Sequence, residues 1–332
     1  MTLDDQQFKK WLRRPTEFIA NAWYLLASAG QYVLGYAVMY LAQLLAVFGI
    51  GLNGEALTVI ASSLSQILLF MLPVVVYTVT HDGVEQSMRL NLPRPAPLIL
   101  AVFAAPLGVM FSDKLSTWWM LLLESLGGTL YASGIPVPTT PEQLVYSLLL
   151  FAVLPGACEE LFFRGGLMGA WERRGTRQAL VITSVLFALL HGSVAGFPVQ
   201  LMMGFVLGYL VVLSDSLFVG MAYHITHNAV TMVLAYLSRE ITVDPYADLA
   251  GYIHLTGGFS ALTAQTIVWA LLYGGVLTAL FILLRKQGGQ IDRIADGDKE
   301  PMTWETLIVL LAGLLTVGVT FMSDLLTVCG VL

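Results

Sequence analysis

Three groups of polar residues interrupt a chain that is otherwise mostly apolar. The first is the run EELFFRG, the second is FALLH, which ends at His191, and the third is HITHN, which contains His224 and Asn228. Ionisable side chains inside apolar segments are costly, and in membrane proteins they usually mark functional sites. Carboxylates, imidazoles and amides are residue types that carry out acid–base hydrolysis. The three groups are therefore candidates for a single hydrolytic site.

The spacing within EELFFRG separates its two acids. Neighbouring residues of a helix point about 100° apart, so Glu159 and Glu160 do not face the same site. Glu160 and Arg164 are one turn apart with the acid first, which is the favourable order for an ion pair. We therefore predict that Glu160 and Arg164 are a supporting pair and that Glu159 is an unpaired carboxylate, available as a general base. The alternative is a purely structural network of both acids with Arg164.

The two later groups supply the remaining chemistry. His191 is the predicted partner of Glu159, and together they would hold and deprotonate a water molecule. His224 and Asn228 are also one turn apart, and a neutral imidazole and an amide supply the N–H donors that a developing oxyanion needs. The structural alternatives are a packing histidine for His191 and an interhelical hydrogen-bonded pair for His224 and Asn228.

The composition indicates what kind of elements position these groups. The 332 residues are 57% hydrophobic and 11% charged, with a mean hydropathy of +0.77. About 20 apolar residues cross the hydrocarbon core of a bilayer as a helix. The sequence thus predicts an all-α, polytopic transmembrane bundle of nine spans, or eight. We place them at 28–51, 57–80, 96–112, 143–164, 178–197, 198–214, 216–238, 262–284 and 304–323.

The distribution of basic residues predicts the orientation of these spans. With a cytoplasmic N-terminus, every Lys and Arg except Lys114 and Arg239 falls on the cytoplasmic side, as the positive-inside rule requires. The N-terminus has no apolar region with a cleavage site, so we expect no signal peptide to be removed. We divide the chain into an N-terminal accessory region (1–140), a catalytic core (141–238) and C-terminal accessory helices (239–332). The first three spans are expected to carry polar residues only in their loops.

Two further patterns bear on how the helices meet. At 1.5 Å per residue, Glu159 lies about 21 Å before Arg173 and His191 lies about 21 Å after Arg177, so the groups should share one depth. The glycine pairs Gly165/Gly169 and Gly204/Gly208 have the four-residue spacing that permits close helix approach in lipid. We therefore expect dense packing around the polar groups.

The three runs resemble the ordered motifs of a known family. EExxxR, FxxxH and HxxxN, over about residues 141–236, are similar to those of the CPBP family, the CAAX-protease and bacteriocin-processing group that includes Rce1-type prenyl endopeptidases. The resemblance implies an intramembrane endopeptidase in which Glu159 and His191 activate water and His224 and Asn228 stabilise the oxyanion. It implies a supporting role for Glu160 and Arg164. The implied substrate is a membrane-associated or lipidated peptide or protein, and the implied location is the cytoplasmic membrane of a prokaryote.

Zinc is the alternative to metal-free hydrolysis. A catalytic zinc ion needs three protein ligands and an open position, and Glu159, His191 and His224 are the candidate ligands. The chain has no HExxH run, and ligation by His224 would remove a donor from the oxyanion hole. We therefore expect no cofactor and no metal.

The same residue types also occur in two other classes of membrane protein. A non-catalytic scaffold or bacteriocin-immunity-type protein is disfavoured because every motif residue is present. A proton-coupled transporter is disfavoured because the polar groups form one cluster instead of a pair of broken helices. We expect a multi-pass protein whose partners are the lipid bilayer and its substrate, with no nucleic acid. No sequence feature specifies an oligomeric state.

Overall fold

The computed structural model describes residues 14–81, 84–128, 136–240, 248–255, 257–287 and 302–330, and within these ranges it contains helices and no strand. Eight of the described helices are long and apolar enough to cross a membrane, and Thr176–Leu190 is a shorter apolar helix. The prediction of an all-α bundle with eight or nine spans is confirmed. The basic N-terminal segment and the linker 288–301 lie outside the described residues.

The helices follow one another with few long connections. Three of the elements are π-helical turns (η1, η2, η3) and one is a 3₁₀ turn (η4), so that Gly54–Thr80 and Pro141–Arg174 are each one continuous rod. The elements are α2 (Glu17–Val47), α3 (Gly54–Ser65), η1 (Gln66–Met71), α4 (Leu72–Thr80), α5 (Val84–Ser87), α6 (Pro95–Ser125), α7 (Pro141–Ser147), η2 (Leu148–Val153), α8 (Leu154–Glu160), η3 (Leu161–Leu167), α9 (Met168–Trp171), η4 (Glu172–Arg174), α10 (Thr176–Leu190), α11 (Phe197–Ser214), α12 (Leu217–Leu237), α13 (Leu249–Leu255), α14 (Gly258–Lys286) and α15 (Trp304–Val328).

Several spans differ in length from the sequence pattern. The third was predicted at 96–112, but α6 continues to Ser125. Lys114 is buried within it, and its ammonium group lies 2.8 Å from the Asp113 carboxylate. The fourth was predicted at 143–164, yet the rod continues through its glycines to Arg174. The fifth, predicted at 178–197, ends at Leu190, so His191 lies at a helix terminus.

Local capping explains where the rod Pro141–Arg174 begins. Thr140 accepts a hydrogen bond from the backbone N–H of Gln143, and the Gln143 side chain bonds back to the Thr140 backbone. This reciprocal arrangement satisfies two backbone donors that a helix start leaves unpaired. Pro141 occupies the first helical turn, where a missing N–H costs nothing. The capping residues and the proline thus fix the start of the fourth span directly after the proline-rich break.

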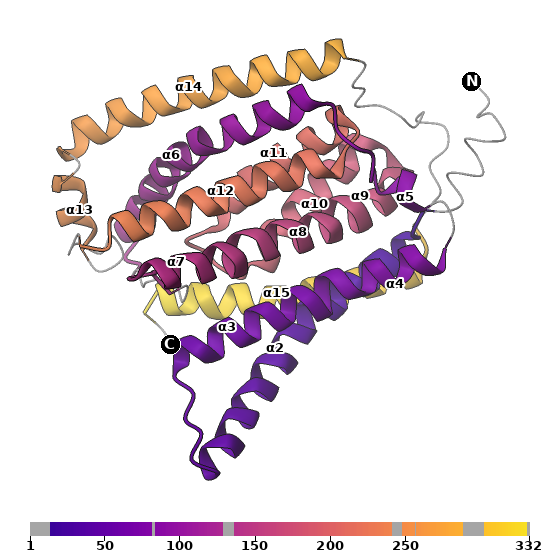
Figure 1. Ribbon diagram of the computed structural model, residues 1–332, viewed down its shortest axis with the longest axis horizontal. Helices are drawn as coiled ribbons and strands as arrows, with labels where there is room; N and C mark the ends of the chain where they lie inside the picture. Colours follow the sequence, from indigo (N-terminus) through magenta and orange to yellow (C-terminus); the bar gives the residue numbers. More distant parts are fainter. Residues whose placement is uncertain are drawn as a thin grey trace.

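The helices form a bundle with one splayed pair. Figure 1 shows α8, α10, α11 and α12 at the centre, with α6 and then α14 on one side and α15, α3 and α2 on the other. The most extensive contacts join α2 to α15, α10 to α11, and α6 to both α12 and α14. The far ends of α2 and α3 diverge from the bundle as a V. The central helices are those that carry the motif residues.

Three connections meet at one end of the bundle. The buried Arg89 guanidinium lies 2.5 Å from the Glu172 carboxylate and 3.3 Å from that of Asp215. Arg14 also pairs with Glu172, at 3.0 Å. The nearby carboxylates raise the pKa of Arg89 despite its burial, so the charge is retained. The positive-inside pattern predicted that these connections share one side of the membrane, and they do lie together. That this side is cytoplasmic stays a prediction.

Candidate active site

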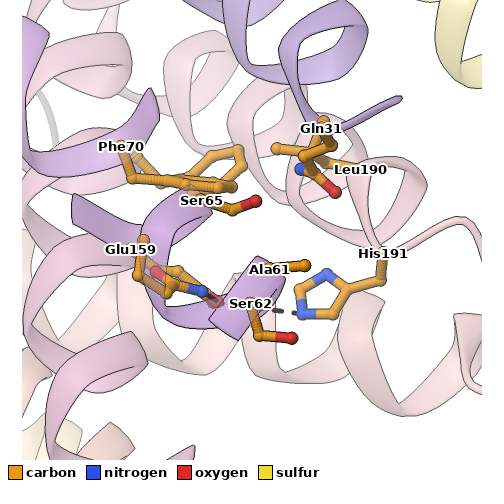
Figure 2. Close-up of a pocket in the computed structure, with 10 residues that line it drawn as sticks. Gln31, Ala61, Ser62, Ser65, Phe70, Glu159, Leu190 and His191 are labelled. Atoms are coloured by element: carbon orange, nitrogen blue, oxygen red, sulfur yellow. Dashed lines mark hydrogen bonds and ion pairs between the residues drawn. The ribbon is translucent and has the colours of Figure 1, made fainter. Parts of the chain in front are cut away.

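Glu159 and His191 line one cavity of about 330 Å³. Glu159 is on the last turn of α8, and His191 directly follows α10. The His191 Nε2 atom lies 3.9 Å from Glu159 Oε2; the Glu159 side chain is 10% exposed, whereas that of His191 is 30% exposed. Figure 2 shows the two side chains directed into the same space, with Ser62 beside the imidazole. The structure thus brings together the two residues predicted to hold a water molecule.

The His191 ring is held in one orientation by its own helix. Its Nδ1 lies 2.8 Å from the carbonyl oxygen of Phe187, one turn earlier. A carbonyl only accepts, so Nδ1 carries the hydrogen and Nε2 of a neutral ring keeps a lone pair. That lone pair faces Glu159. Two acceptors at this distance do not bond directly, since hydrogen bonds are shorter than about 3.2 Å, but a molecule that donates to both fits between them.

Arg164 pairs with Glu160 and not with Glu159, as the spacing predicted, but the Glu159 carboxylate has a hydrogen-bond partner that the spacing did not predict. The Gln66 side-chain N–H donates to Glu159 Oε1 over 2.8 Å. Gln66 begins the π-helical turn η1, in the second membrane rod. Gln31 of α2 and Ser65 of α3 line the same cavity. The expectation that the first three spans carry polar residues only in loops is therefore wrong.

Glu160 joins the first and third polar groups. The Arg164 guanidinium lies 2.6 Å from Glu160 Oε1, which is the ion pair that the one-turn spacing predicted. The same oxygen lies 3.0 Å from His224 Nδ1. Arg164 also donates to the Gly204 carbonyl over 3.1 Å. Glu160 and Arg164 are fully buried, so these bonds supply the partners that a buried charge requires.

The aromatic residue of FALLH connects the two imidazoles. The Phe187 ring makes edge contacts with His191 and His224, with centroids 4.7 Å and 6.0 Å apart. The Arg164 guanidinium lies over the same ring, 4.6 Å from its centroid. Neither this role of Phe187 nor that of Gln66 was predicted. An amide within an apolar span was the available signal for Gln66.

His224 and Asn228 are less directly connected to the cavity. Among the described residues that line it, neither is present. His224 is buried on α12, and Asn228 lies one turn later and is partly buried. The nearby His227 is buried and its Nε2 lies 3.3 Å from the Ser112 hydroxyl on α6. His224 therefore contacts Glu160, whereas Glu159 and His191 line the cavity.

The candidate zinc ligands do not form a metal-binding group. Within the part of the chain that the structure describes, no three His, Cys, Asp or Glu side chains are arranged to hold a metal ion. His224 Nδ1 is engaged by Glu160, whereas Glu159 and His191 face the cavity. Glu159, His191 and His224, as arranged, do not fit a zinc site with three protein ligands.

Comparison with known proteins gave one family. Residues 141–230 match the family described as type II CAAX prenyl endopeptidase Rce1-like. Comparisons with curated proteins and with solved structures gave no match. The matched segment contains all three motifs and spans α7 to α12. It does not include the helices that supply Gln31 and Gln66.

Proposed function

We propose that the chain is an intramembrane endopeptidase in which Glu159 and His191 activate the attacking water, because residues 141–230 match the Rce1-like family of CAAX prenyl endopeptidases. The observation that supports this proposal is the shared cavity, in which the carboxylate and the imidazole lie 3.9 Å apart. The proposed substrate is a membrane-associated or lipidated peptide or protein. Its scissile amide would lie in the cavity beside the water.

The proposed reaction begins with a water that donates to Glu159 Oε2 and His191 Nε2. As its oxygen bonds to the carbonyl carbon of the scissile amide, one water proton moves to the Glu159 carboxylate, acting as general base. The C–N bond then breaks, and that proton passes to the leaving amine nitrogen. The products are a new amine and a new carboxylic acid, which releases the second water proton to the solvent and becomes a carboxylate. Water attack requires no covalent intermediate on the enzyme.

His224 and Asn228 are proposed to stabilise the oxyanion, with one change from the sequence-based prediction. The Nδ1–H of His224 points at Glu160, so Nε2 of a neutral ring would be an acceptor. His224 can therefore donate through Nε2 only as an imidazolium, for which the Glu160 carboxylate supplies the counter-charge. We expect a charged donor from His224 and a neutral one from Asn228. The two together oppose the negative charge that develops on the carbonyl oxygen.

The proposal is tested on membranes from cells that make either the unaltered protein or Glu159→Gln. Gln has the same shape but is no general base, so peptides with new termini should appear only with the unaltered protein. Mass spectrometry of membrane peptides detects these termini and identifies the substrate. Equal amounts of folded protein in both membranes provide the control. Identical peptide sets in the two samples would instead favour a non-catalytic scaffold or a transporter.

A further inference from the structure

Gln66 is a polar residue in a membrane rod that no motif includes. It lies 93 residues before Glu159 in sequence, yet its side-chain N–H donates to Glu159 Oε1 over 2.8 Å. It lines the cavity together with Glu159 and His191. It is also outside the segment 141–230 that matches the family. The candidate active site therefore includes a helix that the family resemblance does not cover.

The other end of the Gln66 amide has no partner. Its Oε1 atom is buried and makes no hydrogen bond to any described residue. Leaving a buried amide oxygen unsatisfied is unfavourable, because the lost water is not replaced. The position of this side chain is thus not explained by satisfying its own polar atoms. It is explained by the hydrogen bond that its N–H donates to the Glu159 carboxylate.

Local helix geometry directs Gln66 toward the rod Pro141–Arg174, which carries Glu159 and is called the catalytic rod below. The π-helical turn η1 begins at Gln66, and η1 packs against α8, which carries Glu159. A π-helical turn inserts an extra residue into a helix, changes the direction of the side chains around it, and is frequent at functional sites. Phe70, in the same turn, contacts Phe162 and Phe163 of the catalytic rod. These aromatic contacts pack the turn against the rod beside the Gln66–Glu159 hydrogen bond.

We propose that Gln66 is a positioning residue that fixes the Glu159 carboxylate for water activation. With Oε1 bound by Gln66, rotation of the carboxylate is restricted and Oε2 remains directed toward His191 Nε2. A general base works only when it is held within hydrogen-bond reach of the proton that it removes. This inference rests on the proposed function, since it assigns Gln66 a role through Glu159. It makes the second membrane rod part of the catalytic machinery.

The deciding variant is Gln66→Met, which keeps an unbranched side chain of similar length but has no N–H donor. We expect its kcat to fall by roughly 10- to 100-fold, as for loss of a hydrogen bond to a charged group, while KM changes little. Thr58→Val is the matched control on α3, because among the described residues the Thr58 hydroxyl bonds only to the Gly54 carbonyl of its own helix. Its kcat should equal that of the unaltered protein. The substrate is the peptide identified by the membrane comparison above.

The outcomes separate this inference from the proposed function. Loss of cleavage in Glu159→Gln with full kcat in a folded Gln66→Met would overturn the role of Gln66 alone. Cleavage that persists in Glu159→Gln would overturn the proposed function. A role in helix packing alone would lower the unfolding temperature in detergent and leave kcat per folded molecule unchanged, which also contradicts the proposal. If Gln66→Met does not fold, Gln66→Asn, which withdraws the amide by one methylene, tests the same loss of kcat.

Discussion

At the scale of single residues, hydrogen-bond partners decide what each motif side chain can do. Sequence spacing predicted the Glu160–Arg164 pair, and the structure contains it. Spacing could not predict that Glu160 also binds His224, because that contact joins residues 64 positions apart. It also could not show which nitrogen of each imidazole carries the hydrogen. That property follows from the Phe187 carbonyl for His191 and from the Glu160 carboxylate for His224.

The buried ion pair makes a prediction at this scale. Arg164→Met removes the partner of a fully buried carboxylate, and such a loss destabilises a protein by about 3–5 kcal/mol. We expect a lower unfolding temperature in detergent and less folded protein in the membrane. Arg164→Lys keeps the charge but loses the forked geometry that reaches both Glu160 and Gly204, so its stability should be intermediate. Equal stability of all three proteins would contradict a structural role for the pair.

At the scale of helices, small residues and irregular turns determine how closely the site residues approach. A Cβ atom at Gly204 would lie 2.8 Å from the Ser184 Cα atom, so α10 and α11 cross at this glycine, as its spacing predicted. At Gly165 the nearest atom would be 3.6 Å away, so no close helix crossing occurs there. Composition predicted the apolar rods, but the π-helical turns were not predicted, since no sequence signal marks them. Those turns contain Gln66 and Arg164.

The helix crossing can be tested by one pair of substitutions. Gly204→Val places methyl groups against the α10 backbone and should destabilise the protein by about 1–3 kcal/mol, as overpacking does. It should also lower cleavage, because α10 carries Phe187 and ends at Leu190, directly before His191. Gly165→Ala adds a methyl group at ordinary contact distance and is the control, with nearly unchanged melting and cleavage. Equal melting temperatures for the two variants would show that α10 and α11 do not meet at Gly204.

At the scale of the whole molecule, the accessory regions complete the site. The cavity has walls from the first two rods, and the segment after His191 is held by two further helices. The Val194 N–H donates to the Asp324 carboxylate of α15 over 2.6 Å, and Trp119 of α6 donates to the Val194 carbonyl over 2.7 Å. The sequence predicted the motif-bearing core but treated the remaining spans as accessory. Contacts between residues 75 to 130 positions apart, such as those of Val194, cannot be predicted from local patterns.

The anchor on α15 gives a prediction for a helix outside the matched segment. Asp324→Leu removes the acceptor for the Val194 N–H, so the segment that follows His191 should lose its fixed position. We expect cleavage to fall roughly tenfold, the effect of losing a charge-assisted hydrogen bond, while the bundle stays folded. Ser323→Ala, at the exposed neighbouring position, is the control and should keep full activity. Full activity in Asp324→Leu would show that α15 does not position His191.

The most direct test of the central claim is the turnover number of purified protein in lipid vesicles, measured with its identified substrate for Glu159→Gln and His191→Ala. Each residue is proposed to contact the attacking water, and acid–base groups contribute about 10²- to 10⁴-fold to such reactions. We therefore predict that each variant loses at least 100-fold in kcat, by the lower bound of that range, while its unfolding temperature stays that of the unaltered protein. A folded variant of either kind that retains full turnover would contradict water activation by this pair.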